Sequence, residues 1–148
     1  MSARKPLVLV SGEIAQLPAG DTLSAPVSEV ALLTLTNGDA GNHVLGDVVY
    51  ISAADTAKKA KADAAGTKDA MAFATATIAT STTGSYQTDG LLAGMAGLTA
   101  GAVYYVSPTT AGVITSTAPS TTGQFVTRVG IAVSTTELLI QFERSIAL

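Results

Sequence analysis

The sequence predicts an all-β protein, a small antiparallel β-sandwich or barrel with an extended N-terminal arm. The 148 residues are rich in Ala, Thr, Gly, Ser and Val, and Thr and Val favour strands while Gly interrupts them. Short apolar runs alternate with turn residues along most of the chain, a pattern typical of sandwiches and barrels. Hydrophobic residues make up 47% of the chain, which is enough to build a core.

Residues 1–45 are predicted to form the arm, with one or two strands. The segment Lys5–Val10 contains a short apolar run. Pro18 and Gly20 then prevent a long regular element. The run Val30–Thr36 has strand character and ends in Asn-Gly-Asp, which is a strong turn signal. Apolar faces in such an arm need a partner, either their own domain or a neighbouring subunit.

Residues 46–148 are predicted to form a β-sandwich or barrel domain with an internal repeat, whose units are 46–100 and 101–148. The matching segments are Gly46–Ser52 with Gly101–Ser107, and Phe73–Ala76 with Val129–Ala132. Two units are too few for a solenoid, so we expect two related β-units packed together. The alternative is chance similarity between β-rich segments.

Within this domain the apolar runs predict successive strands. They are Val48–Ile51, Val103–Val106, Gly112–Thr115, Phe125–Val133 and Leu138–Glu143. The third run should pair with one of the first two. Gly130 indicates a bulge or a close backbone approach, and the short turn Ser134–Glu137 predicts an antiparallel hairpin leading to the last strand. The segment Ala53–Ala65 lacks large apolar residues at helical spacing, which favours strand or loop.

The charge balance excludes several classes of function. Charged residues make up 13% of the chain, the net charge is −3 and the pI is about 4.9. Nucleic acid is not expected as a partner, because phosphate binding needs a basic patch. No apolar run is long enough for a membrane span or a signal-peptide core. A soluble monomer normally carries more surface charge, so this composition indicates a surface covered by neighbours.

No catalytic, cofactor-binding or metal-binding residue is predicted, and we do not expect an enzyme. The chain has no Cys and one His, which argues against a zinc site. His43 follows a turn and is expected to be an exposed loop histidine. Gly94–Gly101 is Gly-rich but lacks the Lys-Ser or Lys-Thr ending of a phosphate loop. The acidic residues Asp55, Asp63 and Asp69 match no calcium loop.

Several stretches resemble known bacteriophage proteins. Lys5–Asp21 resembles the amino-terminal segment of many phage structural proteins. Gly97–Pro108, Gly112–Thr115 and Val129–Ile140 are similar to a β-module of phage tail fibres, head fibres and capsid decoration (cement) proteins. The resemblance implies β-rich subunits, often trimeric, with no catalytic residues to carry over. The chain departs from long fibres, since it has no heptad stretch and no collagen-like repeat.

The resemblance implies a structural virion protein, most simply a decoration protein that binds the outside of the phage head and stabilises it by bridging capsid subunits. The expected partners are the major capsid protein or other virion proteins, and the expected assembly is a homotrimer. Its location would be the particle surface after synthesis in the host cytoplasm. The alternative is a tail or head-fibre component, or a host-receptor or glycan-binding module with exposed aromatic residues.

The interface is expected on the arm and on the strand that follows it. Apolar residues at alternate positions and two basic residues near the start are the candidates, because they would otherwise lack a partner. They are Arg4, Lys5, Leu7, Leu9, Ile14, Leu17, Leu33 and Leu35.

Overall fold

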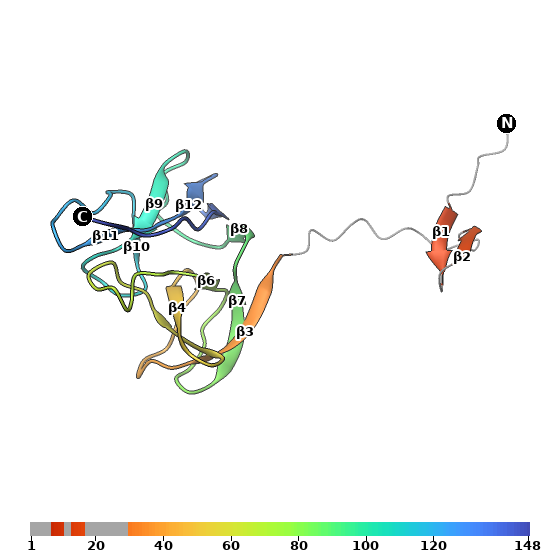
Figure 1. Cartoon of the computed structure of the whole chain (residues 1–148). Helices are drawn as coiled ribbons and strands as arrows, with labels where there is room; N and C mark the ends of the chain where they lie inside the picture. Colours follow the sequence, from red (N-terminus) through yellow and green to blue (C-terminus); the bar gives the residue numbers. More distant parts are fainter. Residues whose placement is uncertain (1–6, 11–12, 17–29) are drawn as a thin grey trace.

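The computed structural model describes two short strands, Leu7–Val10 and Glu13–Gln16, and the continuous stretch 30–148 (Figure 1). Its described residues form strands and no helix, which confirms the predicted all-β class. The strands are β1 Leu7–Val10, β2 Glu13–Gln16, β3 Leu32–Asn37, β4 Val48–Ala53, β5 Thr56–Lys59, β6 Ala72–Ala74, β7 Thr83–Gln87, β8 Gly90–Ala93, β9 Val103–Val106, β10 Ile114–Thr115, β11 Phe125–Val126, β12 Arg128–Ala132, β13 Glu137–Ile140 and β14 Ile146–Ala147.

The strands β3 to β7 close into a five-stranded barrel, in the order β3-β5-β4-β6-β7. Neighbours pair antiparallel except β3 and β5, which are parallel at Thr36 and Thr56. Three alanines, Ala57, Ala72 and Ala74, lie in the barrel core. Small side chains suit the narrow interior that so few strands enclose, so the Ala-rich composition supports closure.

The second sheet repeats the strand order of the barrel. It contains β8, β9, β10, β12 and β13, in the order β10-β9-β12-β13-β8. The barrel, cut between β3 and β5, reads β5-β4-β6-β7-β3. In both sheets, therefore, successive strands of the chain occupy the same positions in the strand order. The segments Gly46–Ser52 and Gly101–Ser107 contribute the equivalent strands β4 and β9. The difference is closure, because β8 and β10 do not pair with each other.

The boundaries between the structural units differ from those predicted from the sequence. The strand β3, which was assigned to the arm, pairs with both β5 and β7 and is part of the barrel. The two sheets begin at Leu32 and Gly90, one strand before the predicted boundaries 46 and 101. The reason is that an isolated apolar run gives no sign of which strands it will pair with.

One core joins the barrel to the second sheet. It includes Phe73 and Val48 from the barrel and Leu138, Ile140 and Val106 from the second sheet, all essentially inaccessible to solvent. Side chains from both sheets fill the same core, so residues 30–148 fold as one body. A smaller cluster fills the barrel interior.

Most predicted strand features are confirmed. The strand β10 pairs with β9, and β12 and β13 form the expected hairpin. Residues 53–65 contain β5 and no helix. The register shifts at Gly130, and a Cβ there would lie 2.3 Å from the carbonyl oxygen of Leu139, so both a bulge and a close approach are present. The strand β13 is not the last, because β14 follows and pairs with β11.

Candidate interaction surface

The predicted interface residues fall into three groups. Arg4, Lys5 and Leu17 lie outside the described residues. The strands β1 and β2 form a two-stranded antiparallel sheet in which Leu9 pairs with Ile14. By alternation along the strands, Leu7, Leu9 and Ile14 occupy positions of the same face.

The remaining two candidates lie on β3 and differ in their exposure to solvent. Leu33 is 38% exposed and is free to contact a partner. Leu35 is buried in the barrel core, so its assignment to an interface is wrong. The barrel closes around the C-terminal half of β3, where β5 joins it, and this closure encloses Leu35 but not Leu33.

The outward face of the second sheet carries an apolar row across neighbouring strands. The registers pair Leu91 of β8 with Leu139 of β13, and Leu139 with Ile131 of β12. Ile131 in turn pairs with Val103 of β9. Residues paired in this way lie on the same side of a sheet. Leu91 and Leu139 are 43% and 36% exposed. We call these residues the outer row.

The adjacent row of the same sheet points into the core. Leu92 pairs with Leu138, and Leu138 pairs with Ala132; all three are buried. The sheet is therefore apolar on both faces, whereas an antiparallel sheet with one face in water normally alternates apolar and polar residues. Exposed apolar faces are common at protein–protein contacts, which makes the outer row a candidate interaction surface.

The outer row was missed at the level of sequence, although a signal for it exists. Leu138–Ile140 and Val103–Val106 are apolar at consecutive positions. Consecutive apolar residues in a strand place apolar side chains on both faces. The pattern cannot say which face meets the core, because that depends on which side of the sheet the barrel packs.

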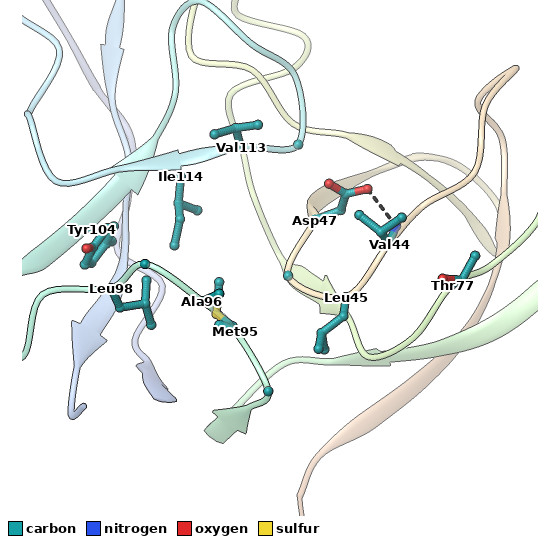
Figure 2. Close-up of a pocket in the computed structure, with 14 residues that line it drawn as sticks. Val44, Leu45, Asp47, Thr77, Met95, Ala96, Leu98, Tyr104, Val113 and Ile114 are labelled. Atoms are coloured by element: carbon teal, nitrogen blue, oxygen red, sulfur yellow. Dashed lines mark hydrogen bonds between the residues drawn. The ribbon is translucent and has the colours of Figure 1, made fainter. Parts of the chain in front are cut away.

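A groove of about 520 Å³ lies where three loops meet (Figure 2). The loops are Val44–Asp47, which leads into β4, Gly94–Leu98, which follows β8, and Gly112–Ile114, which leads into β10; Thr77 and Tyr104 complete the lining. The barrel and the second sheet both contribute, so the groove exists only because the two sheets pack together.

Two polar side chains that line this groove, Asp47 and Tyr104, already have partners within the fold. The Oδ2 atom of Asp47 accepts a hydrogen bond from the Val44 N–H at 2.8 Å and pairs with Lys59 Nζ at 2.9 Å. The Tyr104 hydroxyl accepts a hydrogen bond from the Thr99 N–H at 3.0 Å. The groove therefore suits an apolar side chain better than an ionic ligand.

His43 is completely buried, so the expectation of an exposed loop histidine is wrong. Its backbone pairs with Ile78 in an isolated β-bridge, which draws the segment after the turn into the barrel. Its Nε2 atom lies 2.9 Å from Asp39 Oδ2, and its Nδ1 atom lies 2.8 Å from the Tyr86 hydroxyl. Both ring nitrogens thus have partners inside the fold.

The direction of each hydrogen bond in this cluster depends on which ring nitrogen of His43 carries the proton. With a neutral ring, the Nε2–H of His43 donates to Asp39, so Nδ1 accepts and the Tyr86 hydroxyl donates. Burial raises the pKa of Tyr86 to about 12, and the charges of Asp39 and Asp47 add to the effect. The phenol therefore remains a donor at neutral pH. The arrangement ties the turn to the barrel wall and leaves no ring nitrogen open to a substrate.

The charged and aromatic residues show two further points. In the part of the chain that the structure describes, no group of three or more His, Asp or Glu is placed to hold a metal ion. Tyr104 is buried and its neighbour Tyr105 is half-buried, because successive side chains of a strand point to opposite faces. Tyr50 is half-buried and Tyr86 is buried, so no tyrosine offers a freely exposed ring for stacking on a sugar.

The described residues include no helix long and apolar enough to cross a membrane. Comparisons with protein-family models, with curated proteins and with solved structures gave no match to this chain.

Proposed function

We propose that this chain is a structural subunit of a bacteriophage particle, a decoration protein that binds the outside of the head and bridges capsid subunits. The observation that carries the proposal is the outer row, an apolar face on a chain with only 13% charged residues. An apolar sheet face exposed to water is unusual in a monomer and suits a permanent protein contact.

Burial of the outer row would supply the binding free energy. Complete burial of a fully exposed Leu, Ile or Val side chain contributes about 1.5–3 kcal/mol, and the side chains of the outer row, which are already partly buried, would each contribute a fraction of that. Leu91 and Leu139 are the most exposed members of the row and gain most from being covered. One such contact is modest once the cost of association is included. Repetition over a shell, with each oligomer touching several capsid subunits, raises the overall affinity through multivalency.

The resemblance of Lys5–Asp21 and of Gly97–Pro108 to phage segments supports the location on a virion. The partners would be the major capsid protein or other virion proteins, and the subunits would assemble as homotrimers. The half-buried or buried state of every tyrosine gives the glycan-binding alternative no support.

The test is to mix the purified protein with undecorated phage heads and to image them by cryo-electron microscopy. Regular density at fixed positions of the head lattice is expected, and it would give the oligomer number directly. Heads that stay bare would overturn the decoration role. Binding to tails or to host-surface polysaccharide would then be measured to test the fibre alternative.

A further inference from the structure

The second sheet ends in an open edge where the barrel is closed. In the barrel, β3 pairs with β5 on the side away from β7. The equivalent strand of the second sheet is β8, which pairs with β13 and stands at the end of the strand order. The strand β8 therefore has one edge without a neighbouring strand among the described residues.

The hydrogen-bond register shows which backbone groups lie on that edge. Val133 N–H donates to Glu137 C=O, and Gln141 N–H donates to Val129 C=O, so the odd-numbered residues of β13 face β12. Backbone groups alternate in direction along an antiparallel strand. The even-numbered residues of β13 therefore face β8, where they meet Gly90 and Leu92.

By the same alternation, the N–H and C=O groups of Leu91 and Ala93 point away from β13. Within residues 30–148 they form no backbone hydrogen bond to another segment. Both residues are exposed, so an incoming strand can reach them. An exposed strand edge of this kind is a template for pairing with another chain.

The β1–β2 hairpin requires a further strand or surface to pack against. A two-stranded hairpin alone is at best marginally stable in water, and β1 reads Leu-Val-Leu-Val, apolar at every position. Both β1 and β8 have four residues. Addition of the hairpin to β8 would extend the second sheet by two strands.

The surroundings of the arm favour a second copy as the source of the hairpin. Residues 17–31 join β2 to β3 and can span at most about 50 Å when extended, enough to reach a neighbouring subunit. Where the arm enters the barrel, Val30, Leu32 and Leu33 are 39%, 54% and 38% exposed. A neighbouring copy that supplies the hairpin would also cover this apolar root. A hairpin folded back on its own β8 would not need to cover the root.

We propose that the free edge of β8 receives the β1–β2 hairpin of a second copy of this chain, so that copies are joined by exchanged arms. The inference concerns self-assembly and does not depend on the virion role proposed above.

Disulfide formation between cysteines introduced into the full-length chain tests the proposal. The sequence contains no native Cys, so every disulfide must join introduced residues. One variant carries Leu91→Cys on β8. Four others each carry one cysteine on β1, at Leu7, Val8, Leu9 or Val10. Each β1 variant is mixed with Leu91→Cys under mild oxidation, and intact mass spectrometry identifies the products. A heterodimer is expected for at least one position of β1.

Other products would overturn the proposal. Leu91→Cys homodimers alone would mean that two β8 edges pair with each other. A disulfide formed only within one chain of a β1–Leu91 double-cysteine variant would mean that the arm folds back on its own β8. Absence of any crosslink, with a monomeric mass for the unmodified chain by light scattering, would show that the edge stays free.

Two substitutions at Ala93 form a matched pair, in which Pro blocks strand addition and Val is the control. Ala93→Pro removes an N–H that points away from β13, so it leaves the existing sheet bonded while blocking strand addition. We expect loss of the heterodimer and a lower oligomer mass, whereas Ala93→Val should retain both. Leu91→Lys, at an exposed edge position, is the second blocking variant if the proline variant does not fold. Retention of the wild-type oligomer in the folded blocking variants would contradict the proposal, whether or not heads are bound.

Discussion

The hydroxyl of Tyr86 lies 2.8 Å from Nδ1 of His43, and neither residue is accessible to solvent. The contact joins a strand of the barrel to the segment that follows β3. Because Nε2 of the same ring is held by Asp39, the histidine bridges the barrel wall and the turn.

Tyr86→Phe should therefore destabilise the fold. The variant keeps the ring but leaves Nδ1 of His43 buried without a partner, which costs about 1–3 kcal/mol. Denaturant unfolding followed by circular dichroism measures the loss. Tyr105→Phe is the control, since Tyr105 is half-buried at the surface of the second sheet, and it should change the free energy of unfolding by less than about 0.5 kcal/mol. Equal effects of the two changes would contradict the role of the bridge.

The same tyrosine predicts a loss of stability in alkali. Its pKa is about 12 in the folded chain against 10.0 for an unperturbed tyrosine. Below pH 10 the phenol is protonated in both states, so its full contribution is present. Between these values the unfolded chain releases the proton first, and the free energy of unfolding falls by at most about 1.4 kcal/mol per pH unit. Unfolding curves across this range should show a shallower decline for Tyr86→Phe than for the wild type. Parallel declines would rule out this contribution.

Gly130→Ala tests the close approach of β12 and β13. The added Cβ would lie 2.3 Å from the Leu139 carbonyl oxygen, and this backbone atom cannot move without disturbing the hairpin. Overpacking of this kind costs about 1–3 kcal/mol. Gly66→Ala is the control, because a Cβ there meets nothing within 4 Å. Thermal unfolding compares the two, and a Gly130→Ala protein as stable as the control would show that the hairpin yields easily.

Leu139→Lys tests whether the outer row binds the head. Leu139 is 36% exposed, so the folded chain should lose less than about 0.5 kcal/mol of stability. A charge at the centre of an apolar contact is costly to bury, and head binding measured by co-sedimentation should be lost. Met71→Lys changes an exposed apolar residue of the barrel, 51% accessible, and should bind heads like the wild type. If Leu139→Lys still decorates heads normally, the outer row is not the contact.

The sequence by itself determined the local features of this fold. Apolar runs bounded by turn residues predicted the strands β4 and β9 close to their observed bounds, and predicted β13 with an end at Glu143 where the strand ends at Ile140. Glycine within an apolar run predicted the irregularity at Gly130. These features depend on the steric preferences of neighbouring residues, so a single sequence is enough to find them.

Only the tertiary structure decided which strands share a sheet and which residues face solvent. Closure of the barrel by the parallel pairing of β3 with β5 buried Leu35 and left Leu33 exposed. The bridge to Ile78 buried His43. The open edge of β8 exists because the second sheet does not close, and the outer row is exposed because the barrel packs on the other face of that sheet. Pairing between distant segments depends on the packing of the whole chain, and local sequence patterns do not encode which side of a strand that packing will cover.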